Sequence, residues 1–221
     1  GWLIAKGLHE LGYPVTVYTI QPLTQLKPDI RALIADACSG MVISESLPEQ
    51  SVDEKAVWVD ALLGTGLEQE ARSPEREWIA RLNDLKKEVM ISIDLPSGLP
   101  TDEGHLWGAV VNATYTLTFQ RMKPSFLFPE SGVHAGRVIV LPIGLDPAFE
   151  QATQTKSYLI EGASLRAFLP ERNPFSHKGT YGHALLICGS RGKMGAAVLA
   201  ARAALRCGCG LLSVYTPASS S

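Results

Sequence analysis

Two apolar strands in the first half of the chain each run directly into an acidic residue. Residues 56–59 precede Asp60, and residues 89–93 precede Asp94. A strand that is apolar on both faces is buried on both, which is typical of a parallel sheet covered by helices on each side. Ligands of such sheets bind at the carboxyl ends of the strands. We therefore expect Asp60 and Asp94 to lie at one binding edge.

Helical and extended patterns alternate along the remaining sequence. The alternation predicts a Rossmann-like, doubly wound and mostly parallel α/β sheet in residues 1–150. Polar, irregular sequence over 146–163 suits a linker, which we place at 151–163. A second α/β pattern then occupies 164–221. The spacing predicts helices over 3–11, 29–38, 74–87 and 196–206, and further strands over 15–20, 40–43, 114–119, 138–141, 184–188 and 211–216.

Charge and composition exclude several classes of protein. The 221 residues carry a formal net charge of −2 and no basic tract, which argues against a nucleic-acid polymer as partner. No apolar run approaches the roughly 20 residues that span a bilayer. The spacing of the cysteines does not match a zinc site. We expect reduced, buried thiols and a cytoplasmic location; the cysteines are Cys38, Cys188, Cys207 and Cys209.

A glycine-rich loop follows the first acidic strand. Gly64 and Gly66 let the backbone approach a ligand and point amides at it, although a plain tight turn has the same sequence. Asp60, at the end of an apolar strand, needs a partner. A cation, a ligand hydroxyl or a capped helix would each satisfy it.

The second acidic turn is more specific, since residues 94–98 read Asp-Leu-Pro-Ser-Gly. Pro96 fixes φ and Gly98 permits a left-handed turn, so Asp94 and Ser97 are presented in a defined geometry. A carboxylate there can accept hydrogen bonds from ribose-like hydroxyls or take a proton. The alternative is that Asp94 and Ser97 only cap the next segment.

The loop 189–195 suggests an anion-binding helix start but fits neither common phosphate-binding template. A Walker loop ends in Gly-Lys-Ser/Thr, whereas this loop ends in Met194-Gly195. Its glycines are three residues apart, which does not match the dinucleotide fingerprint. The histidines show no metal-site spacing, and the sequence offers no Ser/His/Asp or Cys/His arrangement.

Taken together, these segments resemble a known family. Residues 60–67 and 93–98 look like the NAD(P)H-hydrate epimerase domain, also called the YjeF N-terminal domain. Residues 177–182, with 189–190 and 194–197, look like the opening of the ADP-dependent NAD(P)H-hydrate dehydratase domain, which has a ribokinase-like fold. Both in this order resemble the bifunctional NAD(P)H-hydrate repair enzymes of bacteria. Further matches to the epimerase pattern are Lys123, Gly136 and residues 141–144.

The resemblance implies repair of hydrated NADH and NADPH by epimerisation, followed by ADP- or ATP-dependent dehydration in the second domain. It also implies that Asp60 and Ser97 help to hold a potassium ion. Asp94 would contact the hydrated dinucleotide and is our candidate for acid–base catalysis. Ala197 would touch substrate in the second domain, and we expect a homo-oligomer. The other implied substrate-binding residues are Gly64, Thr65, Gly66, Leu67, Glu68, Gln69 and Glu70.

The chain also departs from the family pattern. Only the last glycine of the family's Asn-Asn-Gly-Gly-Asp-Gly loop is present, as Gly1, and the second α/β pattern stops after two strands. We therefore expect a fragment truncated at both ends. The isolated chain should then lack dehydratase activity and have weakened epimerase activity.

Other functions stay open at this point. One is a non-catalytic module that binds a nucleotide or a protein on an epimerase-like fold, which Asp94→Ala in an active parent would separate from an enzyme. Another is a ribokinase-like small-molecule kinase, a fold that needs no Walker lysine. A nicotinamide dehydrogenase is the weakest alternative, because the glycine fingerprint fails.

Overall fold

The computed structural model describes residues 1–28, 30–32, 41–49, 53–168 and 171–218. The chain divides into two compact units, Gly1–Thr153 and Gln154–Ser221. Each unit is a separate body, and the boundary between them falls within the stretch predicted as a linker. None of the helices in the described ranges combines the length and the apolar character that a membrane crossing requires.

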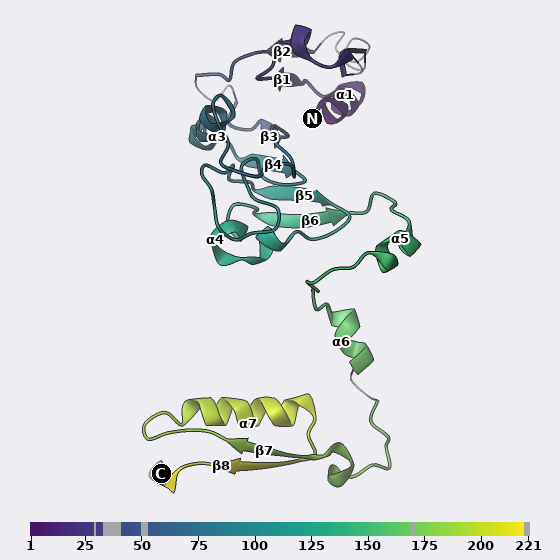
Figure 1. Cartoon of the computed structure of the whole chain (residues 1–221), viewed down its shortest axis with the longest axis vertical. Coiled ribbons are helices and arrows are strands. Elements are labelled where there is room, and N and C mark those ends of the chain that lie inside the picture. Colours follow the sequence, from purple (N-terminus) through teal and green to yellow (C-terminus); the bar gives the residue numbers. More distant parts are fainter. Residues whose placement is uncertain (29, 33–40, 50–52, 169–170, 219–221) are drawn as a thin grey trace. The chain divides into compact units, whose positions relative to one another are not determined.

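The first unit is built on a parallel sheet of four strands in the order β3-β4-β5-β6 (Figure 1). This confirms the parallel α/β fold and the four strands predicted from the apolar runs. Two more strands, β1 and β2, pair in parallel with each other and form a separate sheet. The strands are β1 (Thr16–Tyr18), β2 (Val42–Ser44), β3 (Val57–Asp60), β4 (Val89–Ile93), β5 (Tyr115–Phe119) and β6 (Arg137–Leu141).

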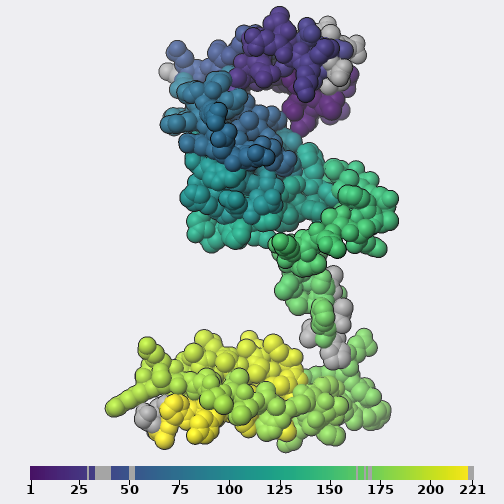
Figure 2. Space-filling model, viewed as in Figure 1, coloured from purple at the N-terminus to yellow at the C-terminus, as the bar shows by residue number. Residues whose placement is uncertain are grey.

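One face of the four-stranded sheet carries the core of the unit. Met90 of β4 is paired in register with Trp58 of β3 and is 1% exposed. Helix α3 (Glu75–Asp84) lays Ile79 and Leu82 against this face, as the helical periodicity predicts. The space-filling view shows the continuous outer surface of the first unit around these strands (Figure 2). Burial on this side holds the carboxyl ends of β3 and β4 in fixed positions.

The opposite face of the same sheet is less covered than the sequence predicts. Most of its side chains are apolar, but Val57 is 58% exposed and Val59 is 37% exposed. Ile139 and Leu141 on β6 are similarly open. The helices among the described residues therefore bury the two faces of the sheet unequally.

Helix α3 ends at Asp84, three residues before its predicted end. Leu85 adopts an extended conformation, and the Lys87 ammonium donates hydrogen bonds to the carbonyl oxygens of Leu82 and Leu85. Those bonds satisfy acceptors that the last turn would otherwise leave free. The helix predicted over 29–38 lies largely outside the described residues. The other helices of this unit are α1 (Trp2–Glu10), η1 (Leu23–Gln25), η2 (Pro124–Leu127), α4 (Pro129–Gly132) and α5 (Pro147–Ala152).

Part of the predicted linker is helical. Asp146 caps α5, because its side chain accepts a hydrogen bond from the amide of Ala148. Pro at the first helical position supports the same short helix. A second helix, α6 (Gly162–Phe168), begins at the other end of the stretch. The polar composition thus obscured two short helices.

The second unit contains one β-α-β arrangement. Strands β7 (His183–Ile187) and β8 (Leu211–Tyr215) are parallel, and α7 (Gly195–Cys207) connects them and lies along them (Figure 1). A short helix, η3 (Lys178–Tyr181), precedes β7. This confirms the predicted strand–helix–strand pattern.

The prediction of buried thiols is wrong for Cys207, which is exposed. The less exposed face of α7 follows Ala197, Ala200, Ala201 and Ala204, whereas residues 205–207, the last of the helix, are all exposed. Cys188 and Cys209 are unpaired and half-buried. Cys38 lies outside the described residues.

Candidate functional site

The carboxylate of Asp60 ends β3 and is only 3% exposed. Its Oδ1 accepts hydrogen bonds from Ser97 Oγ at 2.5 Å and from the Leu62 amide at 3.3 Å. Its Oδ2 accepts from the Ser97 amide and from Ser92 Oγ, both at 2.8 Å. A carboxylate has about four acceptor positions, and all four are used. Asp60 therefore ties the end of β3 to the turn that follows β4.

The charge of Asp60 has no compensating cation among the described residues. The ion pairs found there involve other carboxylates. Burial raises the pKa of Asp60, and the hydrogen bonds from Ser97, Ser92 and Leu62 offset that rise only in part. The partner that the sequence predicts for Asp60 is thus a set of hydroxyl and amide donors.

Ser97 is the residue that joins the two turns. Its hydroxyl donates to Asp60 and accepts from the Leu63 amide at 2.9 Å. The side chain is 1% exposed. The two predicted metal-binding residues, Asp60 and Ser97, are therefore in direct contact, and the glycine loop begins at the residue after Leu63.

The turn after β4 has a backbone that few residues adopt. Asp94 has φ 69° and Gly98 has φ 93°. A Cβ added at Gly98 would lie 2.2 Å from the carbonyl oxygen of Ala109, so only glycine fits. The Ser97 carbonyl also accepts from the Val111 amide at 2.9 Å. No helix begins at this turn, so the alternative that Asp94 and Ser97 cap a following helix is wrong.

The carboxylate of Asp94 turns toward β5. Its Oδ1 accepts from Lys123 Nζ at 2.7 Å, Thr118 Oγ1 at 3.1 Å and the Phe119 amide at 3.2 Å. Burial alone would raise the pKa of Asp94, but the Lys123 ammonium and the two other donors outweigh it and hold the pKa below its usual range. Asp94 is thus ionised at neutral pH.

The loop that contains Gly64, Thr65 and Gly66 is exposed. It is held at one point, where Thr101 Oγ1 donates to the carbonyl oxygen of Thr65 at 3.3 Å. The backbone amides of this loop remain accessible to a ligand. That accessibility suits the predicted role of the glycines.

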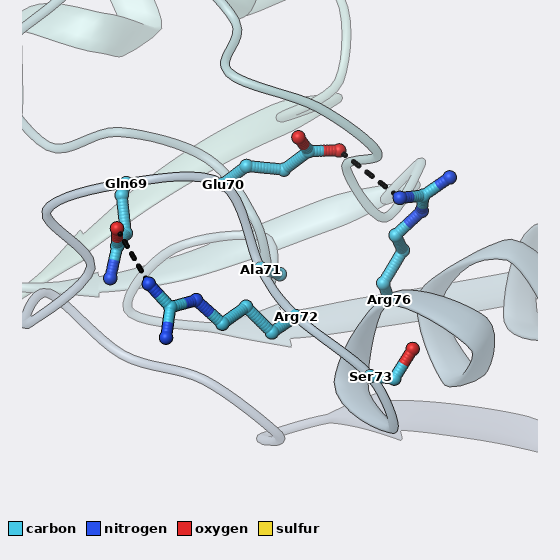
Figure 3. Close-up of a pocket in the computed structure, with 6 residues that line it drawn as sticks. All are labelled: Gln69, Glu70, Ala71, Arg72, Ser73 and Arg76. Atoms are coloured by element: carbon cyan, nitrogen blue, oxygen red, sulfur yellow. Dashed lines mark hydrogen bonds and ion pairs between the residues drawn. The ribbon is translucent and has the colours of Figure 1, made fainter.

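Two shallow cavities follow the same loop, one of 400 Å³ and one of 310 Å³. In the larger one Gln69 accepts a hydrogen bond from Arg72, and Glu70 pairs with Arg76 at 3.9 Å (Figure 3). The smaller cavity includes Leu67 and Glu68. The remaining side chains of the larger cavity are Ala71 and Ser73.

The structure brings the two candidate carboxylates of the first unit to one edge of the sheet. Asp60 and Ser92 are register partners on parallel strands, and Asp94 lies two residues further along β4. Both carboxylates therefore lie at the carboxyl end of the sheet, as predicted. Their side chains point to different neighbours, Asp60 to the turn of Ser97 and Asp94 to β5.

Lys123 and Thr118 contact the candidate carboxylate, yet reasoning from the residues did not select them. Lys123 entered only as one position of a family pattern, and Thr118 as part of a strand. The available signal was weak, because a lysine just after a strand is usually solvated. Alternation along β5 does place Thr118 on the buried face, where a hydroxyl needs a partner.

Ala197 lies in the second unit, in the first turn of α7, and is 3% exposed. The loop before this helix contains Gly189 with φ 94° and Gly192 with φ 73°. The chain reverses there before it enters α7. The substrate contact of Ala197 stays a prediction.

The fold and the two joined turns define a Rossmann-like α/β protein with a candidate ligand site at the carboxyl edge of its sheet. The sequence profile of the family described as YjeF-related protein N-terminus matches residues 1–125. The chain therefore belongs to the YjeF-related family. The match includes β3, β4, β5 and Lys123.

Curated relatives extend the similarity over almost the whole chain. The bifunctional NAD(P)H-hydrate repair enzyme Nnr of Coxiella burnetii is 37% identical over 98% of this chain, which covers 44% of that protein. The enzyme of the same name from Escherichia coli is 34% identical over 98% of the chain, and that from Methanothermobacter thermautotrophicus is 39% identical over 99%. The chain spans less than half the length of these relatives.

A solved structure has the same fold. The crystal structure of the yeast protein ynu0 matches with a TM-score of 0.51 at 18% identity, over 71% of this chain and 67% of the yeast chain. At that identity the likeness shows the fold alone. It supports the α/β architecture derived above from register and burial.

Proposed function

We propose that residues 1–153 bind hydrated NADH or NADPH at the carboxyl edge of the β3–β6 sheet and interconvert its two epimers. The relatives named above carry NAD(P)H-hydrate repair in their names. The observation that carries the proposal is the geometry of Asp94, a partly exposed carboxylate at a strand end whose Oδ1 is held by Lys123, Thr118 and the Phe119 amide. This is the place where ligands of parallel α/β sheets bind.

The chemistry of epimerisation suits such a group. Interconverting two epimers breaks and remakes a bond at one carbon, and a carboxylate can accept and return the proton that this requires. The lowered pKa keeps Asp94 ionised, so its carboxylate is free to accept a hydrogen bond or a proton, although the same shift makes it a weaker base. The backbone amides of Gly64, Thr65 and Gly66 would contact the dinucleotide, and the side chains of Leu67, Glu68, Gln69 and Glu70 would line the approach.

The oxygens of Asp60 and Ser97 would help to hold a potassium ion. A carboxylate and a hydroxyl are hard oxygen ligands, and the charge of Asp60 has no cationic side chain beside it among the described residues. Because four hydrogen bonds already reach the Asp60 oxygens, the ion would share these oxygens with their present donors. A bound cation would compensate that charge and stiffen the junction between the two turns. The proton-transfer role stays with Asp94.

For the second unit we propose a part in the ADP- or ATP-dependent dehydration of the same substrate. The β7–α7–β8 arrangement and the similarity of the whole chain to bifunctional relatives support this. The N-terminus of α7 and the loop before it would face an anionic ligand. Ala197 would form part of the wall of that site. Assembly into a homo-oligomer and a cytoplasmic location remain predictions.

The proposal is tested by following the two epimers of hydrated NADH with the purified chain, by chromatography under conditions where spontaneous exchange is slow. We expect the chain to speed interconversion and Asp94→Asn to lower the acceleration by about 100-fold or more, leaving a measurable residual rate. Asn tolerates the positive φ of position 94, so the turn is retained. Asp146→Asn is the matched control, because it removes an equal charge and leaves the cap of α5 in place. Interconversion no faster than without protein contradicts the proposal.

A further inference from the structure

Lys123 is held in an unusual way for a lysine that follows a strand. Its Nζ donates to Asp94 Oδ1 at 2.7 Å, to Thr118 Oγ1 at 2.8 Å and to the carbonyl oxygen of Phe119 at 2.9 Å. The side chain is only 15% exposed. An ammonium group has three protons, and each of them is used. Lys123 therefore has no proton left to donate to a ligand.

The bonds to Asp94 are unequally divided between its two oxygens. Oδ1 accepts all three hydrogen bonds of the side chain, from Lys123, Thr118 and the Phe119 amide. Among the residues that the structure describes, none donates to Oδ2. The Asp94 side chain remains 19% exposed. One oxygen is thus anchored and the other is left to accept a bond from outside.

The backbone around this pair fixes the direction of the carboxylate. The Asp94 amide donates to the Leu117 carbonyl at 2.8 Å, which continues the β4–β5 ladder by one residue before the chain turns at positive φ. On the other strand Gln120 also has positive φ, at 59°, and its amide is bonded to Leu141. Both strand ends are therefore held, and the Lys123 ammonium bridges them.

We propose that Lys123 is a positioning residue, which anchors Oδ1 of Asp94 so that Oδ2 alone meets the reacting group of the substrate. The inference rests on the proposed function. Lys123 itself does not touch the substrate, because its protons are engaged. The same contacts keep the carboxylate charged, in line with the lowered pKa of Asp94.

The test uses Lys123→Met, which keeps most of the length of the unbranched side chain but removes its donors. An unanchored carboxylate samples other orientations, and a misplacement of about 1 Å can cost about 100-fold in rate. We expect kcat to fall by about 10- to 100-fold with little change in KM. Lys87→Met is the matched control, because the Lys87 ammonium also binds main-chain carbonyls but lies at the end of α3. Its kcat should stay that of the unmodified chain.

A double-mutant cycle separates positioning from a structural role. If Lys123 acts through Asp94, then Lys123→Met in an Asp94→Asn background should lower kcat no further. A purely structural role would give the same loss in both backgrounds and would overturn the inference. Should Lys123→Met fail to fold, Thr118→Val removes another donor to Oδ1. It should show a smaller loss with the same lack of additivity.

The outcomes distinguish the two proposals. An unmodified chain that does not speed epimerisation contradicts the proposed function itself. If that chain is active and Asp94→Asn lowers its rate as expected, whereas both Lys123→Met and Thr118→Val keep full kcat, then only the positioning role is wrong.

Discussion

Asp60 and Asp94 end neighbouring parallel strands at the same edge, but their surroundings differ. Asp60 is buried, accepts four hydrogen bonds from hydroxyls and amides, and has a raised pKa. Asp94 is partly exposed, pairs with Lys123, and has a lowered pKa. The saturated carboxylate holds the two turns together, whereas the other keeps one oxygen open. Carboxylates at similar sequence positions thus differ in what they can do, because one is used up in holding the turns and the other has an oxygen available for the proposed chemistry.

The largest effect that the comparison predicts is the loss of turnover when Asp94 is replaced by asparagine. The amide keeps an acceptor for Lys123 and tolerates positive φ, but it cannot take up a proton. We expect kcat for epimerisation to fall about 100-fold or more, the usual contribution of a positioned acid–base group. The measurement is the rate of exchange between epimers of hydrated NADH at saturating substrate.

Stability should respond little to the same change. We expect the free energy of unfolding to fall by about 1 kcal/mol or less, because the pair is partly exposed. Tryptophan fluorescence reports the first unit alone, since Trp2, Trp58, Trp78 and Trp107 all lie in it. Loss of the folded signal with Asp94→Asn would make its carboxylate a structural group, and the contrast with Asp60 would disappear.

The second effect is on stability, by Asp60→Asn. Each Asp60 oxygen accepts from one backbone amide, so whichever way an asparagine is turned, its NH₂ group faces an N–H that cannot reverse. A buried unsatisfied pair costs about 1–3 kcal/mol. We expect a loss of about 2 kcal/mol in urea unfolding of the first unit, followed by fluorescence. Stability equal to that of the unmodified chain would mean that the four hydrogen bonds do not hold the turns.

The difference between the two carboxylates explains what sequence reasoning could and could not predict. The apolar strands 56–59 and 89–93 were enough to predict a parallel sheet and to place both acids at one edge, because strand period and burial are local properties. Gly98 was likewise readable as a turn residue. These features depend on neighbours in sequence.

The distribution of hydrogen bonds depended on residues far apart in sequence. The bond from Ser97 to Asp60 joins positions separated by 37 residues, and the contact of Lys123 with Asp94 joins positions separated by 29. No spacing rule selects such pairs. The exposure of Cys207 was missed because composition does not show which side chains of a helix are covered. The short helix at Pro147–Ala152 was missed because its polar composition resembles that of a linker.

The third effect concerns potassium and should affect only the Asp60 turn. If potassium is present at about ten times its dissociation constant, its binding adds about 1.4 kcal/mol to the free energy of unfolding. In a chain this long, that corresponds to a rise of about 3–5 °C in the melting temperature. We expect this rise in potassium chloride relative to choline chloride at equal ionic strength. Asp60→Asn should lose it and Asp94→Asn should keep it. An equal rise in both variants would mean that the ion acts elsewhere.

The smallest effect is the dependence of stability on pH, which should have opposite signs for the two acids. Asp94 has a lowered pKa in the folded state, so its charge stabilises the fold above the unfolded pKa of about 3.9. That contribution is lost as the pH falls through the folded pKa. Asp60 has a raised pKa, so its bound proton stabilises the fold at low pH, and this contribution is lost as the pH rises through the folded pKa.

Unfolding free energies of the unmodified chain, Asp60→Asn and Asp94→Asn between pH 3.5 and 7 test these signs. The unmodified chain should have a higher free energy of unfolding than Asp94→Asn, and this difference should grow with pH. The growth should be less than about 1 kcal/mol, because the Asp94 side chain is partly exposed. The corresponding difference in the free energy of unfolding between the unmodified chain and Asp60→Asn should shrink over the same pH range. Asp146→Asn, an exposed cap, serves as the reference for a simple loss of charge. Slopes of the same sign for the two acids would contradict these signs, because burial dominates the pKa of Asp60, whereas at Asp94 burial is outweighed by Lys123 and two further donors.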